Sequence, residues 1–378
     1  MSSSEATLAR KSAGGTQEVT ASNARRIRAQ LLSRAGALDL QSGRWELGAA
    51  LWNSFRTHGV AWISCPPALR TLIRPAYESF IAFSSLPLAR REAHFRPEIG
   101  GARGFIWRGR SVPAILDGEI ALDAQEAWHT GRDLNRFPSE VPTFGKCQRE
   151  LFNGLENIGL HLVESLGNFI SDSGYLASLV LNPDGARSGD HLLRTIRYPP
   201  GNAALVSSVC ANTDLVLRHC AHEDLSLLTI LPPATSEGLA LHDEEGWWHP
   251  KMEDEASLLV VPGNMLRLIL AESSVAIRAS IHAVFGTPST MVNDRYSAGM
   301  FITPRCGAPL VNLAADEIIA VEGQRIDEAG VLLYQFLRAR GRTDSRDYAE
   351  FKAQYLAHGE FRLESRPIVL TEYQGEDQ

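Results

Sequence analysis

The sequence predicts an α+β protein with a mainly β core, an antiparallel sandwich or jelly-roll barrel flanked by N-terminal and C-terminal helices. Apolar residues recur every three or four positions through the first half of the chain, which is the helical period. From about residue 190 the pattern changes to short segments of alternating apolar and polar residues, separated by turn residues. Helical periodicity returns after about residue 325. We therefore expect helices around one antiparallel barrel that acts as a single functional unit.

These changes of pattern divide the chain of 378 residues into four segments. Residues 1–36 are rich in small and polar residues, which predicts a flexible leader without a core of its own. Residues 37–189 are expected to form a mostly helical part that packs on the core. Residues 190–310 are expected to form the β core, and residues 311–378 a helical extension.

The first structured elements are a helix and a strand. Leu47, Leu51 and Phe55 recur on one helical face, and Gly59 follows as a helix stop. The next residues, 60–63, are apolar and precede a proline pair, as in a short strand. Further helices are expected at residues 68–87, 146–172, 326–341 and 345–359.

The β core is expected to contain eight short segments with period-two alternation. They are "LLRTIRYPP", "DLVLRH", "LSLLTIL", "GLALHDEEGWW", "SLLVV", "MLRLIL", "IRASIHAVF" and "RYSAGMFIT". Turn residues separate them, which is typical of strands that form a sandwich or barrel.

Composition excludes several classes of function. The formal net charge is −7, and the 37 lysines and arginines are scattered along the chain, so we expect no nucleic-acid partner. Five widely spaced cysteines without a C-x-x-C pair argue against a disulfide framework and a zinc finger, and favour a reducing compartment. No stretch of about 18 apolar residues and no signal-like start occur. We therefore expect a cytoplasmic protein that does not enter a membrane, and leave its oligomeric state open.

A candidate metal site lies at the start of an apolar strand. His222 and Asp224 are two residues apart, so their side chains share one face of a strand. His282 lies on another alternating segment and is a candidate third ligand. Two imidazoles and one carboxylate on one side of Fe(II) leave positions open for oxygen and a cosubstrate. The alternative is that each histidine is an ordinary structural residue.

The triplet alone is a weak signal, because composition alone gives about one H-x-D/E by chance. The chain has two others, His242-x-Glu244 in a turn and His358-x-Glu360 beyond a helix end, which we interpret as surface features. His219 precedes the first triplet and lies outside the motif.

A candidate anion site follows His282 by thirteen residues. Arg295 and Ser297 share one face of the next predicted strand. The planar guanidinium suits a bidentate contact with a carboxylate, and the hydroxyl adds a further hydrogen bond. An anionic cosubstrate near a cationic metal would fit this pair.

Taken in order, these motifs resemble the isopenicillin N synthase-like branch of the Fe(II)- and 2-oxoglutarate-dependent dioxygenase superfamily. The matching stretches are "IRYPP" (196–200), "HEDLSLLTILPPATSEGLAL" (222–241), "GWWHP" (246–250), "LLVVPGNML" (258–266), "SIHAVF" (280–285) and "DRYSAGMFITPR" (294–305). "FRTHGVAWIS" (55–64) and "DAQEAWHTGRD" (123–133) are similar to earlier parts of the family. The resemblance covers residues 38–310 and is clearest from residue 190 onward.

The resemblance implies a double-stranded β-helix that holds Fe(II) through His222, Asp224 and His282. It also implies that Arg295 and Ser297 hold the C5 carboxylate of 2-oxoglutarate. Tyr198 would lie beside the iron and contact a carboxylate of cosubstrate or substrate.

The activity implied is oxidation of a small molecule by O2, with Fe(II) and 2-oxoglutarate, through hydroxylation, desaturation or cyclisation in specialised metabolism. A second possibility is an oxidase like isopenicillin N synthase, which uses no 2-oxoglutarate and holds a substrate carboxylate on the Arg-x-Ser pair. A third is a non-catalytic jelly-roll binding protein whose histidines are structural.

Overall fold

The computed structural model describes most of the chain between residues 38 and 304. The described residues are 28–30, 38–96, 103–108, 114–116, 119–121, 125–170, 174–182, 184–189, 191–201, 216–224, 226–243, 246–250, 257–270, 277, 280–286, 290–304, 310–312 and 317–320. The helices predicted at residues 326–341 and 345–359, and most of the predicted leader, lie outside these residues.

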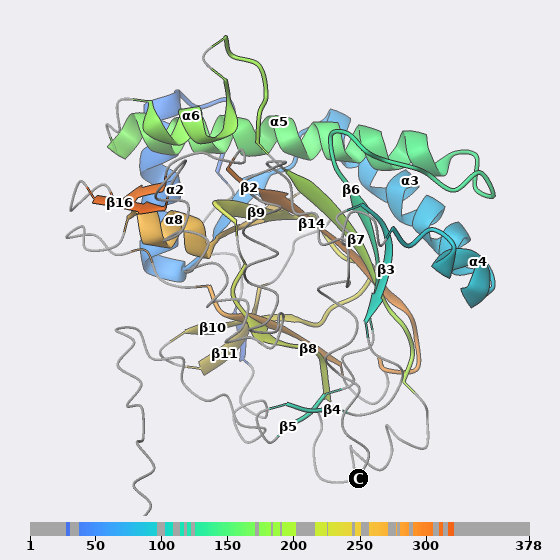
Figure 1. The fold of residues 1–378 in the computed structure, drawn as a ribbon. Coiled ribbons are helices and arrows are strands. Elements are labelled where there is room, and N and C mark those ends of the chain that lie inside the picture. The colour runs from blue at the N-terminus through green and yellow to red at the C-terminus, as the bar shows by residue number, and fades with distance from the viewer. Residues whose placement is uncertain are drawn as a thin grey trace, which may run out of the picture.

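Eight strands form a jelly roll, the double-stranded β-helix that the resemblance implied. They are β7 (Leu192–Tyr198), β8 (Val216–His222), β9 (Leu228–Leu231), β10 (Leu239–Asp243), β11 (Gly246–Pro250), β12 (Ser257–Pro262), β13 (His282–Gly286) and β14 (Arg295–Ile302). One sheet contains the order β12-β9-β14-β7, and the other contains β11-β10-β13-β8. The two sheets face each other in Figure 1.

Strands from the first half of the chain extend both sheets. They are β1 (Arg28–Gln30), β2 (Ala61–Ser64), β3 (Gly104–Arg108), β4 (Ala114–Leu116), β5 (Glu119–Ala121) and β6 (Gln125–Thr130). β2 pairs with β12, and β6 pairs with β7 and β3. The expectation of a mostly helical part before residue 190 therefore missed four strands at residues 104–130. β6 pairs with β7 and β5 with β8 of the jelly roll, and β3 and β4 pair in turn with β6 and β5. Local sequence patterns do not reveal such pairing.

Helices cover the outer face of the sheet that contains β14. They are α2 (Arg44–His58), α3 (Pro67–Ser84), α4 (Leu88–Glu92), α5 (Phe144–Ile170) and α6 (Tyr175–Val180). Figure 1 shows α5 lying across this sheet. The helices predicted from periodicity at the positions of α2, α3 and α5 are present, and Gly59 caps α2 with a left-handed backbone, φ 72°. No helix in the described part of the chain combines the length and apolar character that crossing a membrane requires.

One predicted strand is wrong. "MLRLIL" forms the short helix α8 (Asn264–Ile269) instead of a strand. Leu266, Ile269 and Leu270 are buried together, at helical spacing, in the main core. A short apolar run fits both periods, so sequence alone does not separate them. Beyond the barrel, β15 (Leu310–Asn312) and β16 (Glu317–Ala320) pair with each other in an antiparallel sheet.

The two faces of β14 have different environments. Tyr296, Ala298 and Met300 lie in the core shared with the helices. Because strand side chains alternate, Arg295 and Ser297 point to the opposite face, toward the second sheet. A smaller apolar cluster fills another part of the space between the sheets and contains Val60, Trp62, Leu241, Trp248, Leu259 and Val261.

His191 is buried immediately before β7. Its Nδ1 accepts a hydrogen bond from the backbone N–H of Thr303 at 3.1 Å. A Cβ at Gly189 would lie 2.0 Å from the ring, so only glycine allows this packing. Burial, together with the charges of Arg132 and Arg187, lowers the pKa of His191 from its ordinary value to about 3.

We expect this histidine to make the protein less stable in acid. Its imidazole takes up a proton below about pH 6.5 in the unfolded chain but stays neutral in the folded chain. Between pH 7.5 and pH 5 the free energy of unfolding should therefore fall by about 2 kcal/mol more in the wild type than in His191→Asn. Urea unfolding at the two pH values measures the difference, and identical pH dependence in both proteins would contradict the assignment.

Candidate metal centre

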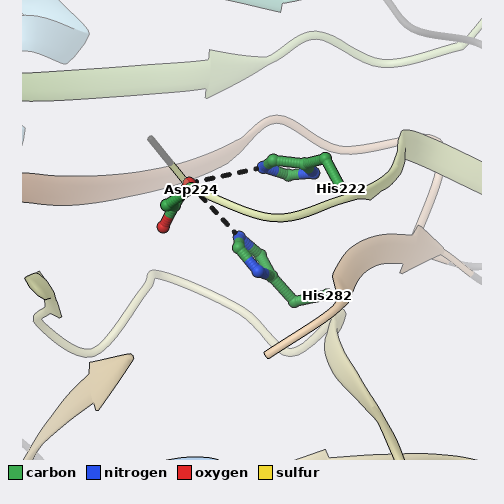
Figure 2. Close-up of side chains that lie close together, drawn as sticks. All are labelled: His222, Asp224 and His282. Atoms are coloured by element: carbon green, nitrogen blue, oxygen red, sulfur yellow. Dashed lines mark ion pairs between the residues drawn. The ribbon is translucent and has the colours of Figure 1, made fainter. Parts of the chain in front are cut away.

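Three potential ligands converge from two neighbouring strands. His222 ends β8 and His282 begins β13, and the two residues are direct partners in the sheet register. Asp224 follows two residues after His222, and its Oδ1 lies 3.7 Å from Nε2 of His222 and 3.8 Å from Nε2 of His282. Figure 2 shows both imidazoles pointing toward this carboxylate. The ligand atoms all lie within 4.8 Å of one another.

The chemistry of the three side chains fits a bound cation. Both N···O separations are too long for hydrogen bonds. Nδ1 of His282 lies 3.0 Å from the carbonyl oxygen of Ser280, so it carries the proton and leaves the Nε2 lone pair directed at Asp224. The second carboxylate oxygen, Oδ2 of Asp224, is buried and has no hydrogen-bond partner among the described residues. Two imidazoles and one carboxylate are the ligand set of open non-haem Fe(II) sites.

Contacts from outside the jelly roll hold His282 in place. Ser280 is buried, and its hydroxyl donates a hydrogen bond to the carbonyl of Gly59. Gly59 is the residue that ends α2. Ser280, whose carbonyl orients the His282 ring, is therefore hydrogen-bonded to the residue that ends α2.

Backbone hydrogen bonds hold the segment after Asp224 in place. The N–H of Leu227 donates to Ile302 at 2.8 Å, and the N–H of Gly263 donates to Leu227 at 2.9 Å. A Cβ at Gly263 would lie 2.1 Å from the carbonyl oxygen of Ser226, so the approach requires glycine. These contacts tie the ligand loop to two strands of the opposite sheet.

Helix α8 adds a side-chain contact to the same loop. Nη2 of Arg267 lies 3.4 Å from the carboxylate of Glu223, the residue between the two ligands. Glu223 therefore interacts with the helix, while His222 and Asp224 face His282 (Figure 2).

The predicted anion-binding residues lie together on the inner face. Arg295 is buried, and its guanidinium carbon lies 5.2 Å from the ring centroid of Tyr198, its partner in the β7–β14 register. Nε of Arg295 donates to the carbonyl oxygens of Ser236 and Glu237, both at 3.1 Å. Nη1 is buried and has no hydrogen-bond partner among the described residues. Ser297 is half-buried on the same face of β14.

Burial lowers the pKa of Arg295 from its ordinary value, and the nearby Tyr198 and Tyr77 act in the opposite direction. Burial likewise raises the pKa of the Tyr77 phenol, against the positive charge of Arg295. The structure thus places the Tyr198 ring against the Arg295 guanidinium.

Sequence reasoning missed two residues that precede the first ligand. Val284 pairs with His219 and Phe285 pairs with Leu217, so Arg218 is the extra residue of a β-bulge. His219 is buried, with its ring centroid 4.2 Å from that of His222. A bulge breaks the strict alternation that sequence patterns rely on, so it could not be placed from the sequence.

Of the other two H-x-E triplets, the structure describes only one member, His242. His242 packs against Trp247 at a centroid distance of 5.1 Å, and Glu244, His358 and Glu360 lie outside the described residues. Within the described ranges, one group of three or more potential metal ligands was found, and it contains His222, Asp224 and His282.

The segment that contains these residues is similar to known proteins. Residues 189–304 match the 2OG-Fe(II) oxygenase superfamily. A curated relative, 1-aminocyclopropane-1-carboxylate oxidase homolog 3 from Arabidopsis thaliana, is 28% identical over 121 residues, which are 32% of this chain. The aligned part spans only 30% of that relative's length.

Solved structures share the fold over more of the chain. A 2OG-Fe(II) oxygenase family protein from Caulobacter crescentus has a TM-score of 0.62 at 24% identity, covering 81% of this chain and 99% of its own. Full-length Neurospora crassa T7H in complex with alpha-KG and thymine has a TM-score of 0.60 at 19% identity, covering 73% of this chain and 88% of its own. The motifs, the jelly roll and the matched segment together identify residues 189–304 as a domain of the 2OG-Fe(II) oxygenase superfamily, consistent with its isopenicillin N synthase-like branch.

Proposed function

We propose that this protein is a non-haem Fe(II)- and 2-oxoglutarate-dependent oxygenase that hydroxylates, desaturates or cyclises a small molecule. The observation that carries the proposal is the convergence of His222, Asp224 and His282 (Figure 2). Bound Fe(II) and 2-oxoglutarate would supply O2 activation and oxidation of a substrate C–H bond. The described N···O separations and the buried Asp224 oxygen suit these residues to hold the ion.

The inner face of β14 and β7 is proposed to hold the cosubstrate. Nη1 of Arg295 is available to donate to the distal carboxylate of 2-oxoglutarate, and the hydroxyl of Ser297 would add a second hydrogen bond. Tyr198, stacked on the guanidinium, would orient it and contribute its phenol to a carboxylate. A related structure that contains alpha-KG and thymine supports this choice of cosubstrate and a small-molecule substrate.

Substrate identity is expected to depend on the segments around Arg103–Arg110 and Trp128–Asp133. These segments meet, because Nε of Arg103 donates to the carbonyl of Asp133 at 3.3 Å. Arg103 thus contacts the protein itself, and its described contacts give no preference for an anionic substrate there.

We also propose that the protein acts in specialised metabolism in the cytoplasm. The free thiols of Cys65 and Cys147 fit a reducing compartment.

The metal assignment predicts a loss of affinity on removing either histidine. His222→Ala and His282→Ala should each weaken Fe(II) binding about tenfold or more, because each variant lacks one imidazole that would bind the metal directly. His242→Ala, from the triplet outside the cluster, should bind Fe(II) like the wild type. Anaerobic calorimetric titration with Fe(II) measures all three. Unchanged affinity in both ligand variants would favour a non-catalytic jelly-roll binding protein.

The cosubstrate assignment predicts a spectroscopic and a chemical signal. Anaerobic Fe(II) protein should develop a weak visible absorption with 2-oxoglutarate, and should form succinate slowly in air without substrate. Arg295→Met should raise the Kd for 2-oxoglutarate about tenfold to a hundredfold, the loss expected for a hydrogen bond to a charged group. Arg197→Met is the control, since Arg197 pairs with Glu126 and Asp294.

Absence of both signals in Fe(II)-binding protein would favour the second possibility, an oxidase like isopenicillin N synthase that uses no 2-oxoglutarate. Arg295 and Ser297 fit this oxidase equally well, because a substrate carboxylate would accept the same hydrogen bonds as the carboxylate of 2-oxoglutarate.

A further inference from the structure

A second buried arginine lies at the end of the barrel that holds Arg295. Arg218 is 3% exposed and is the extra residue of the bulge in β8. A β-bulge turns two successive side chains to the same side, so Arg218 and His219 both leave the strand toward the inner face. Arg218 is four residues before His222, so it belongs to the strand that carries a metal ligand.

The contacts of Arg218 in the described structure are all with neutral groups. Nη2 donates to the carbonyl oxygens of Thr290 at 3.0 Å and Asn293 at 2.8 Å. Nε lies 2.9 Å from Sδ of Met291, a weak acceptor. None of these partners carries a charge, and no carboxylate pairs with Arg218 within the described ranges.

Arg218 and Arg295 approach the same strand, β13, near its end. A Cβ at Gly238 would lie 3.4 Å from Nε of Arg295 and 3.5 Å from Cγ1 of Val284. A Cβ at Gly286 would lie 3.3 Å from Nε of Arg218. The two guanidinium groups therefore flank residues 284–286, and small residues make room for both.

The electrostatic environment agrees with this placement. Burial lowers the pKa of Arg218 to about 10, and the charge of Arg295 adds to that decrease. Tyr198 acts in the opposite direction on both arginines, and Asp294 does so on Arg218. Two buried cations that repel each other, neither in direct contact with a carboxylate of the described residues, destabilise the site. A bound anion would reduce that penalty.

Two other described arginines contact carboxylates directly. Arg197 pairs with Glu126 at 2.9 Å and with Asp294 at 2.8 Å. Arg132 pairs with the buried Glu156 at 2.6 Å. The hydrogen-bond partners of Arg218 are instead carbonyl and thioether groups.

We propose that Arg218 and Arg295 together form a two-arginine site for the distal carboxylate of 2-oxoglutarate. Arg295 contributes the buried Nη1, and Arg218 contributes a second positive charge from the opposite sheet. The inference rests on the proposed function, because it assumes that the cosubstrate binds at Arg295. Arg218 is then a cosubstrate-binding residue that also anchors the turn at residues 290–293.

Paired ligands test this assignment by binding alone. 2-Oxoglutarate and 2-oxopentanoate have the same five-carbon chain and 2-oxo acid group, but 2-oxopentanoate lacks the distal carboxylate. Anaerobic calorimetry with Fe(II)-loaded protein should show that Arg218→Met raises the Kd for 2-oxoglutarate about tenfold or more. The Kd for 2-oxopentanoate should change less than about twofold, and Arg218→Lys should keep most of the affinity for 2-oxoglutarate.

Controls separate charge from structure. Arg197→Met removes a cation that pairs with Asp294, the residue after this turn, and should leave both Kd values unchanged. Urea unfolding reports whether each variant folds. If Arg218→Met does not fold, Arg218→Gln carries the test, because its amide keeps an N–H donor for the turn carbonyls but no charge.

The outcomes are distinct. Equal changes for the two ligands, or no change for either, would overturn the role of Arg218. Failure of the wild-type protein to bind 2-oxoglutarate would instead overturn the proposed function.

Discussion

The pairing of His222 with His282 across β8 and β13 is the constraint on which the candidate site depends. Side chains alternate along a strand, so a shift of one residue in this register would turn one imidazole away from the other. The register is continued on the far side of β13, where His282 is also aligned with Leu241 of β10. Leu241 belongs to the apolar cluster between the sheets. Apolar packing on one side of the site thus helps to fix the position of the polar residues.

The opposite sheet and its helices fix the remaining ligand. Asp224 lies beyond the end of β8, where no strand partner holds it. The following segment is instead held by hydrogen bonds to Ile302 and Gly263. Ile302 packs in the core shared with α5, and a Cβ at Gly159 of that helix would lie 2.2 Å from Cδ1 of Ile302. Close contact between helix and sheet therefore supports the loop that carries the carboxylate.

Sequence patterns predicted the parts of the fold that depend on local periodicity. The jelly-roll strands, α5 and the shared face of Arg295 and Ser297 follow from alternation or helical spacing, and the motif order named the three candidate ligands. The patterns failed for α8, whose short apolar run fits both periods, and for β3 and β6, which depend on pairing with distant strands. They also failed at the bulge that turns Arg218 and His219 inward, since an inserted residue changes the face of those before it.

Some of the described arginines contact carboxylates, whereas others do not. Glu126 contacts both Arg91 and Arg197, so two cations share one anion on a strand that extends the sheet. In the described residues Arg218 and Arg295 meet only neutral groups, and both approach β13. Asp294, which contacts Arg197, offsets part of the charge of Arg218. The two arginines still place positive charge in the same barrel as the carboxylate of Asp224. A ligand with separated anionic groups fits such a field better than a neutral or cationic one, because one end can meet the metal while the other meets the arginines.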